Sequence, residues 1–179
     1  MTNQPETLCA GRFLKLMRRG TWEYAERPNA NAIAAVVAVT DAGEAVFVEQ
    51  RRAPLQTSTI EWPAGLIGDE DAEESIDEGA NRELEEETGY RAQSFERLTR
   101  IPSSPGMTSE TIWLMRAKGL RRMGEGGGTE DEDIHVHHVP LEGVEAWLRQ
   151  REAEGKLIDP KVWAGLYFLV RSGMRAAGV

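Results

Sequence analysis

Three glutamates and an arginine within six residues form the part of the sequence best suited to chemistry. Glu83, Glu86 and Glu87 stand at positions i, i+3 and i+4, and Arg82 directly precedes them. Residues at this spacing share one face of a helix. Three carboxylates on one face repel each other unless a cation lies among them, and oxygen ligands suit hard divalent cations, Mg²⁺ above all. The segment therefore predicts a metal-binding helix face, with a solvated acidic face as the alternative.

The same segment resembles a known signature, the Nudix box, which has the form G-x5-E-x7-R-E-U-x-E-E-x-G-U with U a bulky apolar residue. The specified positions are filled here by Gly68, Glu74, Arg82, Glu83, Leu84, Glu86, Glu87, Gly89 and Tyr90. The resemblance implies a Nudix hydrolase, an enzyme that uses divalent metal ions and water to cleave a pyrophosphate bond.

The resemblance also implies roles for the residues of the box. Glu83 and Glu87 would bind the metal directly, together with the backbone carbonyl of Ala64, and Glu86 would stand beside them as a catalytic residue. Bound Mg²⁺ would neutralise and orient the phosphates and acidify a water molecule. Mn²⁺ accepts the same oxygen ligands, so the sequence leaves Mg²⁺ against Mn²⁺ open.

Arg82 and Glu74 are expected to support the metal-binding residues, because a planar guanidinium can hold two carboxylates in fixed orientation. The loop before Glu74 departs from the family pattern. In family members with a Pro-Ala-Gly motif the glycine of that motif opens the box, but here Gly65 is three residues too far from Glu74. Either Gly68 takes the place of that glycine or the loop carries a three-residue insertion, which we favour.

Four features outside the box resemble the branch of ADP-ribose pyrophosphatases and nucleoside-diphosphate-sugar hydrolases. They are Val48-Glu49-Gln50-Arg51-Arg52, Glu61-Trp62-Pro63-Ala64-Gly65, Ser104-Pro105-Gly106-Met107 with Glu110, and Glu130-Asp131-Glu132-Asp133-Ile134. The branch places Arg52, Glu61 and Glu110 among the substrate-binding residues. Arg51 stands where the branch usually has tyrosine, so a flat aromatic surface is not expected there.

An acidic loop before residue 134 is the second candidate for catalysis. By resemblance Glu130 is the general base, with Glu132 either sharing the metal or acting as the base itself. Loop carboxylates can approach an attacking water when a lid closes. Gly126, Gly127 and Gly128 would make such a lid mobile; a solvated flexible loop is the alternative.

Trp22 lies in a predicted strand near the N-terminus. In this branch an aromatic residue of the N-terminal strands can stack on the nucleotide base, often across a dimer. Ordinary core packing is the alternative. The branch also implies a homodimer in which the N-terminal strands are exchanged.

Composition limits the classes of partner. The net charge of −9 makes long nucleic acid a poor partner, because phosphate binding needs clustered Lys and Arg. No run of about 18 apolar residues is present, so no membrane span is expected. The N-terminus lacks the pattern of a secretory signal. The single cysteine, Cys9, cannot form an internal disulfide, which fits the cytoplasm.

Periodicity and turn residues predict the elements that must position these side chains. We expect one domain over residues 1–179, with residues 1–30 as an N-terminal strand region. Strands are predicted at 22–27, 29–40, 44–52, 58–65, 94–102, 108–120 and 134–140, and helices at 73–88, 141–155 and 159–173. Asp41-Ala42-Gly43 predicts a hairpin between the second and third strands. This order indicates an α+β fold, and the resemblance implies a mixed β-sheet sandwiched between helices (α/β/α) with an N-terminal β extension.

These observations predict a Mg²⁺-dependent pyrophosphohydrolase that cleaves ADP-ribose or related nucleoside diphosphate sugars to a nucleoside monophosphate and a sugar phosphate. The first alternative is a Nudix hydrolase of a nucleoside triphosphate, a dinucleoside polyphosphate or capped RNA. The second is a module that senses ADP-ribose without cutting it.

Overall fold

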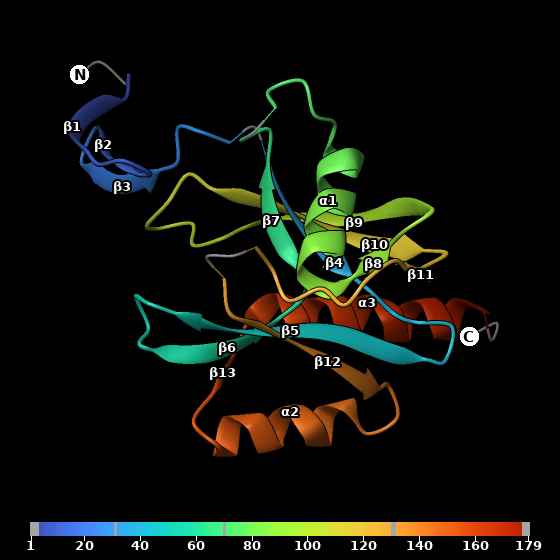
Figure 1. The fold of residues 1–179 in the computed structure, drawn as a ribbon. Helices are drawn as coiled ribbons and strands as arrows, with labels where there is room; N and C mark the ends of the chain where they lie inside the picture. Colours follow the sequence, from blue (N-terminus) through green and yellow to red (C-terminus); the bar gives the residue numbers. More distant parts are fainter. Residues whose placement is uncertain (1–3, 31, 70, 130–131, 177–179) are drawn as a thin grey trace.

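Two four-stranded mixed sheets form the body of the protein in a computed structural model, which describes residues 4–30, 32–69, 71–129 and 132–176 (Figure 1). The first sheet has the strand order β7 (Ala64–Ile67), β4 (Ala32–Val37), β10 (Thr111–Lys118), β9 (Ser94–Pro102). The second has the order β12 (Ile134–Pro140), β5 (Glu44–Arg52), β6 (Thr57–Glu61), β13 (Leu157–Ile158). Each sheet contains one parallel pair, β4–β10 and β6–β13, among antiparallel ones.

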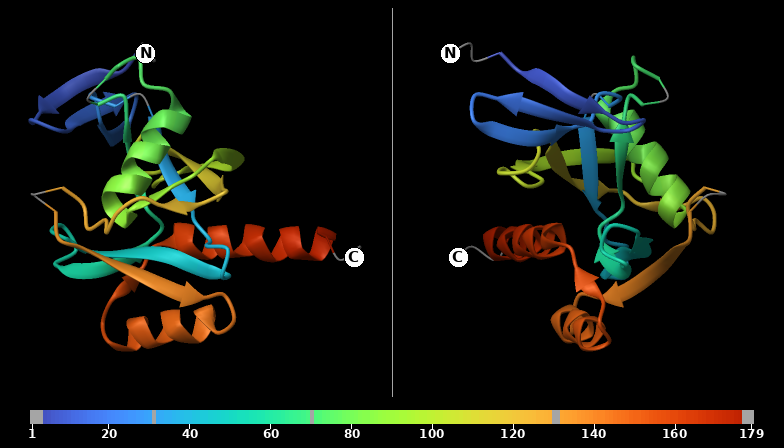
Figure 2. Two further views of the ribbon diagram at one scale, coloured as in Figure 1. Left: turned by 45° about the vertical axis from the view of Figure 1, so that its right-hand side comes forward. Right: turned by 90° about the vertical axis from the view of Figure 1, so that its left-hand side faces the viewer.

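Helices cover both faces of the first sheet. Side chains alternate along β4, so that Ala34 and Val36 pack in the cluster under α1 (Ile76–Thr88), whereas Ala35 and Val37 face the cluster that contains α2 (Val144–Ala153) and α3 (Pro160–Ala176). Figure 2 shows β4 between α1 and α3. The expected α+β fold, a mixed sheet between helices, is confirmed.

Helix α1 carries the predicted acidic face, and local sequence sets both of its ends. Ser75 caps the N-terminus in a capping box with Glu78, so the helix begins at Ile76 rather than at the predicted Glu73. Gly89 ends the helix with φ 73°, a left-handed conformation that glycine adopts without strain.

The predicted hairpin at Asp41-Ala42-Gly43 is confirmed over a short stretch, where Val39 pairs antiparallel with Ala45 and the N–H of Thr40 donates to the Glu44 carbonyl at 2.9 Å. Gly43 has φ 77° and its N–H donates to the Thr40 carbonyl at 2.9 Å. Strand β4 pairs with β7 and β10, however, and β5 pairs with β6 and β12, so both strands already have two partners. The turn therefore passes the chain from one sheet to the other.

The chain returns to the first sheet at Trp62 and Pro63, which separate β6 from β7. The predicted strand 58–65 is thus two short strands in different sheets. This crossing brings Glu61, at the end of β6, close in sequence to Ala64, at the start of β7. It joins the part of the site built on the second sheet to the part built on the first.

A separate three-stranded sheet precedes the body and lies to one side of it (Figure 1). It consists of β1 (Glu6–Ala10), β2 (Lys15–Arg19) and β3 (Trp22–Glu26), of which the sequence predicted only β3 as a defined strand. Its exposed apolar side chains are Leu8, Phe13, Leu14, Leu16 and Trp22. Two further short strands, β8 (Tyr90–Arg91) and β11 (Arg121–Arg122), pair beyond α1. Among the described residues, no helix is both long and apolar enough to cross a lipid bilayer.

Candidate active site

A cleft of about 710 Å³ opens where the two sheets meet. Most of the residues that the sequence singled out line it: Arg52, Glu61, Ala64, Glu83, Glu87, Glu110 and Glu132. They come from β5, β6, β7, α1 and two loops. The fold therefore gathers into one space residues that are far apart in the sequence.

Glu83 and Glu87 form the acidic wall of this cleft. Glu87 is buried, and its Oε2 accepts a hydrogen bond from the backbone N–H of Ala64 at 3.0 Å. Glu83 packs directly over Gly65, where a Cβ atom would occupy the position of the Glu83 carboxylate. The absence of a side chain at Gly65 thus makes room for Glu83.

Burial and repulsion act on both carboxyls. Burial raises the pKa of Glu83 to about 7 even though Arg82 is its neighbour. Burial likewise raises the pKa of Glu87 to about 8, against the hydrogen bond from Ala64, and Glu83, Glu132 and Glu61 raise it further by repulsion. The positive charge near Glu83 and Glu87 is thus too small to offset their burial and repulsion, and a divalent cation would supply more.

The donor set fits Mg²⁺. In the described part of the chain no three His, Cys, Asp or Glu side chains stand together in a geometry that would enclose an ion. Mg²⁺ does not need such a cage, because it keeps several waters and is usually bound by one or two carboxylates and substrate phosphates. Glu83, Glu87 and the carbonyl of Ala64 could supply that smaller set.

Arg82 holds α1 in place through hydrogen bonds to neighbouring side chains and to strand β7. Its Nε donates to Glu74 Oε1 at 3.0 Å and its Nη1 to Glu83 Oε1 at 2.9 Å. Its Nη2 donates to the Leu66 carbonyl at 2.9 Å, which ties the helix to β7. These contacts are the ones that a supporting role requires.

Replacing Arg82 with lysine should lower both stability and turnover, because one ammonium cannot reach all of these acceptors. We expect the free energy of unfolding to fall by about 1–3 kcal/mol and kcat to fall by at least about tenfold as Glu83 loses its orientation. Urea unfolding and steady-state kinetics measure the two effects. Arg91→Lys is the control, since Arg91 holds the exposed Glu85. Equal effects of the two substitutions would contradict the supporting role.

The loop before α1 explains the irregular spacing of the box. Gly68 adopts φ 78°, and its N–H donates to Glu74 Oε2 at 3.2 Å. Glu74 therefore lies between Gly68 and Arg82. Gly65 and Gly68 serve different needs, one making room for Glu83 and the other turning the chain toward Glu74.

The other candidates for catalysis are placed differently. Glu86 points toward Arg82, at 3.5 Å, and does not line the cleft. Glu132 does line it, and its Oε2 accepts hydrogen bonds from the N–H and hydroxyl of Thr129. Glu130, the sequence's candidate for the base, lies outside the described residues.

The backbone conformation explains why three glycines stand at positions 126–128, in addition to the mobility that the sequence predicted for this loop. Gly126, Gly127 and Gly128 all have positive φ, between 74° and 109°. The N–H groups of Gly127 and Gly128 donate to the carbonyls of Glu87 and Glu86 at the end of α1. The loop thereby satisfies helix carbonyls that would otherwise lack partners and brings Glu132 to the cleft.

Arg52 and Glu61 form an ion pair on the wall that β5 and β6 provide. Arg52 donates through Nε and Nη2 to the two oxygens of Glu61, at 2.7 and 2.8 Å. Burial opposes ionisation of Glu61, but these bonds outweigh it and keep its pKa lowered. Glu61 is 4% exposed, lines the cleft and also accepts a hydrogen bond from Thr59, so it holds Arg52 in position, and its contact with substrate stays a prediction.

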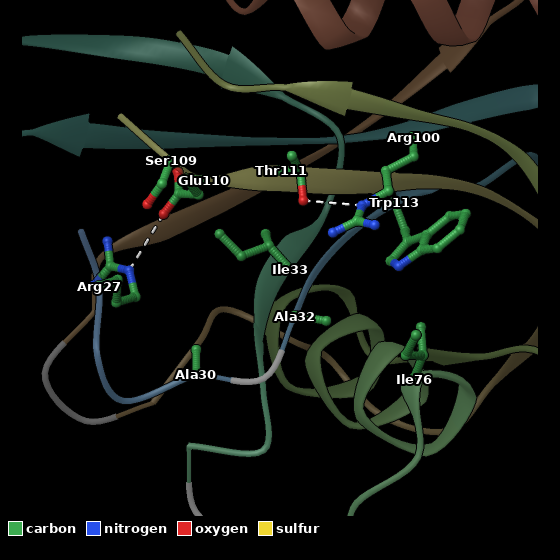
Figure 3. A pocket seen from close by; sticks show the side chains of 10 residues that line it. All are labelled: Arg27, Ala30, Ala32, Ile33, Ile76, Arg100, Ser109, Glu110, Thr111 and Trp113. Carbon is green, nitrogen blue, oxygen red and sulfur yellow. Dashed lines mark hydrogen bonds and ion pairs between the residues drawn. The ribbon is translucent and has the colours of Figure 1, made fainter. Parts of the chain in front are cut away.

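Glu110 lies at the other side of the cleft and accepts a hydrogen bond from Arg27 Nε at 3.3 Å. This pair separates the cleft from a smaller pocket of about 300 Å³ (Figure 3). Arg100 and Trp113 form the far wall of that pocket, and Arg100 Nε donates to Thr111 at 2.9 Å.

Trp22 is not a core residue. Its side chain is 64% exposed, and it borders a shallow depression with Tyr24, Pro105 and Gly106. A backbone hydrogen bond of 2.7 Å from Ala25 to Met107 keeps β3 beside the loop that contains Pro105. The ring is therefore available to another molecule, and base stacking stays a prediction.

Among the described residues, the sequence analysis missed four charged residues of the cleft, which are Arg27, Asp69, Asp159 and Lys161. Asp159 and Lys161 stand at the start of α3 and line the cleft, together with Gln50 and Thr59. Asp-Pro-Lys before an apolar helix is a recognisable start signal, but nothing in it indicates that the helix begins at the cleft.

The pKa shifts predict how the metal-free protein responds to pH. In the folded state the pKa values of Glu83 and Glu87 lie above their ordinary value of 4.5, at about 7 and about 8. The folded protein thus holds protons that the unfolded chain has lost, and stability falls as pH rises from about 4.5 to about 8. Differential scanning calorimetry with EDTA should show a declining Tm over this range.

Mg²⁺ should reverse this decline if Glu83 and Glu87 hold the ion, because it would bind the ionised pair. We expect added Mg²⁺ to raise Tm more at about pH 8.5 than at about pH 5.5, where protons compete with the metal. Ca²⁺-free and Mg²⁺-free samples at each pH serve as the reference. An equal gain at both pH values would show that these carboxyls do not bind the ion.

Comparisons with known proteins agree on the fold and on the box. A model of the NUDIX domain matches residues 30–160. The methanol dehydrogenase activator of Bacillus methanolicus is 31% identical over 175 residues, which are 94% of this chain and 91% of that protein. A crystal structure of an ADP compounds hydrolase has a TM-score of 0.71 and 22% identity, covering 98% of this chain and 94% of that one, and shares the fold.

Two pyrophosphatases are also similar. The ADP-ribose pyrophosphatase of Bacillus subtilis (strain 168) is 38% identical over 119 residues, 66% of this chain and 63% of that protein. The GDP-mannose pyrophosphatase of Cronobacter sakazakii (strain ATCC BAA-894) is 39% identical over 93 residues, 51% of this chain and 47% of that protein. The chain spans less than two thirds of the length of either one.

Proposed function

The chain belongs to the Nudix hydrolase family, and on that premise we propose that it is a Mg²⁺-dependent pyrophosphohydrolase of ADP-ribose or related nucleoside diphosphate sugars. The observation that carries the proposal is one cleft with an acidic wall, Glu83 and Glu87, facing a cationic one, Arg52. In a metal-bound diphosphate, the metal ion would face the acidic wall and the negative phosphate oxygens would face Arg52.

The residues of the cleft would have different roles in hydrolysis. Glu83, Glu87 and the carbonyl of Ala64 would hold the metal, which supplies charge neutralisation and an acidified water when bound. Arg52 would bind the diphosphate through its guanidinium, held in place by Glu61. Glu132 would take the proton of the attacking water, a role that its position in the lining of the cleft supports. Bond cleavage then yields a nucleoside monophosphate and a sugar phosphate.

A hydrolysis screen tests the proposal. ADP-ribose, ADP-glucose, GDP-mannose and UDP-glucose are each incubated with the protein and Mg²⁺, with EDTA as the control, and the two products are separated by anion-exchange chromatography. Mg²⁺-dependent release of a nucleoside monophosphate supports the proposal. Strong turnover of nucleoside triphosphates, with none of these four, would overturn it.

A second candidate function follows from the methanol dehydrogenase activator that is similar over 94% of the chain. Under this second hypothesis, the protein activates a dehydrogenase. Addition to a purified dehydrogenase, with parent and Glu87→Gln proteins side by side, separates the readings. Activation without hydrolysis of free nucleotide sugars favours the second candidate.

We include a homodimer in the proposal, formed through the N-terminal sheet. The exposed apolar residues of that sheet, Leu14, Leu16 and Trp22 among them, are 36% to 64% exposed. A second copy of the sheet would cover them and bring its own Trp22 near a neighbouring site. The single free cysteine, Cys9, fits the cytoplasm as the proposed location.

Leu16→Asp should convert the dimer to a monomer, because a charge buried in an apolar interface lacks a partner. Analytical ultracentrifugation at micromolar concentration measures the change. Val170→Asp, at an exposed apolar position on α3, is the control and should leave the dimer intact. A dimer disrupted by Val170→Asp but not by Leu16→Asp would place the interface on α3 instead.

A further inference from the structure

The start of α3 carries an ion pair that faces the catalytic cleft. Lys161 Nζ lies 2.5 Å from Asp159 Oδ2, and the two side chains are only 15% and 19% exposed. Asp159 Oδ1 also accepts the backbone N–H of Lys161 at 2.7 Å, next to Pro160, the first residue of the helix. One carboxylate thus begins the helix and holds the ammonium, which fixes the position of Lys161 against the cleft wall.

This pair is electrically coupled to the Arg52–Glu61 pair. Lys161 contributes to the lowered pKa of Glu61, and Asp159 contributes to the raised pKa of Arg52. Positive and negative groups therefore alternate along this wall, from Arg52 through Glu61 to Lys161 and Asp159. A second cation stands beside the arginine that is proposed to bind the diphosphate.

Lys161 does not stabilise helix α3 through the helix dipole. A cation in the first turn meets the positive end of the helix dipole, which favours anions. Asp159 needs no cation either, because that same end of the helix already stabilises its charge. Helix α3 has 17 residues and no acidic residue in its first turn. Lys161 and the helix start together therefore carry more positive charge than Asp159 alone neutralises, which favours an external anion at this point.

The position along the cleft indicates which part of a substrate this anion would be. Arg27 directly follows β3 of the N-terminal sheet and lines the cleft with Glu110, so the nucleotide base, which Trp22 of one copy or the other is proposed to contact, is expected at this end. Asp159 and Lys161 follow β13 in the second sheet, away from the N-terminal sheet (Figure 1). We propose that Lys161 binds the sugar-side phosphate of the diphosphate substrate and that Asp159 is the residue that positions it. This inference rests on the proposed function.

Lys161→Met tests the inference, since methionine keeps much of the side-chain volume without the charge. We expect kcat/KM for the best substrate of the screen to fall by about 10- to 100-fold, as loss of a charge-assisted hydrogen bond does. Inhibition by the sugar phosphate product, ribose 5-phosphate in the case of ADP-ribose, should weaken about as much. Inhibition by the nucleoside monophosphate should change by less than about twofold. Lys118→Met, which removes an exposed lysine paired with Glu96, is the matched control.

A double substitution separates substrate binding from a structural role. Asp159→Asn retains an oxygen that can cap α3 but removes the negative charge. If Lys161 only neutralises Asp159, the Asp159→Asn/Lys161→Met protein should recover both the Tm and the kcat/KM of the parent. We expect Tm to recover and kcat/KM to stay low, and partial rescue by Lys161→Arg.

The outcomes are distinguishable from failure of the proposed function. A parent protein that cleaves none of the four nucleotide sugars contradicts the proposed function and this inference together. An active parent whose kcat/KM is unchanged in Lys161→Met contradicts the inference alone. Weaker inhibition by the nucleoside monophosphate, with the sugar phosphate unaffected, also overturns it, because Lys161 would then contact the other phosphate.

Discussion

Glu87→Gln should abolish turnover while making the metal-free protein more stable at high pH. Loss of a metal-binding carboxylate should lower kcat by at least about 10³-fold, which corresponds to about 4 kcal/mol of transition-state stabilisation. Glutamine keeps the shape of the side chain and an oxygen that can accept the Ala64 N–H. The loss of activity therefore would not come from unfolding.

The gain in stability follows from the pKa of Glu87. Burial raises that pKa to about 8, above its ordinary value of 4.5. The stability that this carboxyl contributes is present at low pH and is lost as pH rises through the folded-state value. Glutamine does not titrate, so the variant should exceed the parent in Tm most clearly at about pH 8.5, in EDTA.

Calorimetry and a Mg²⁺-dependent activity assay at the same pH measure the two effects. Glu85→Gln, on the same helix but paired with the exposed Arg91, is the matched control and should change neither. Turnover of Glu87→Gln within about tenfold of the parent would falsify the assignment of Glu87 to the metal.

Gly65→Ala should lower turnover by about 10²-fold with little change in stability, because one methyl group would displace the carboxylate of Glu83. The φ angle of Gly65 is not positive, so the backbone accepts alanine without strain. The atoms that the methyl would meet are the far end of a flexible side chain. The side chain can move aside and the fold survive, but Glu83 then leaves its place beside Glu87.

Gly124→Ala is the control, since a Cβ at Gly124 meets no atom within 4 Å and its φ is not positive. Steady-state kinetics over a range of Mg²⁺ concentrations should show that Gly65→Ala requires more metal for half-maximal rate. If Gly65→Ala keeps the kcat and the metal requirement of the parent, the position of Glu83 over Gly65 is not needed for catalysis.

Local sequence predicted the parts of the site that depend on neighbouring residues. Glu83 and Glu87 share a face because α1 is a helix, and Gly89 ends that helix because glycine adopts the left-handed conformation without strain. Arg82 and Glu74 contact one another across the capped first two turns of α1. Such relations depend on spacing, which a sequence displays directly.

The remaining parts depend on contacts between distant segments. Asp41-Ala42-Gly43 forms the predicted hairpin turn, but the pairing ends after Val39 and Ala45 because β4 and β5 pair with other strands beyond it. The burial of Glu61 follows from the meeting of two sheets. Lys161 reaches the cleft only because β13 pairs with β6 and places the start of α3 there. No local pattern contains this information.

The crossing of the chain at Trp62 and Pro63 divides the cleft between two structural units. The first sheet and α1 carry the proposed metal ligands Ala64, Glu83 and Glu87, whereas the second sheet and α3 carry Arg52 and Lys161, which are proposed to bind the diphosphate. Substitutions around Gln50, Leu55 or Lys161 can therefore change the preferred sugar while the hydrolytic half stays intact. The residues that can change substrate selectivity therefore lie apart from the proposed metal ligands, and directed evolution of selectivity would begin on the second sheet.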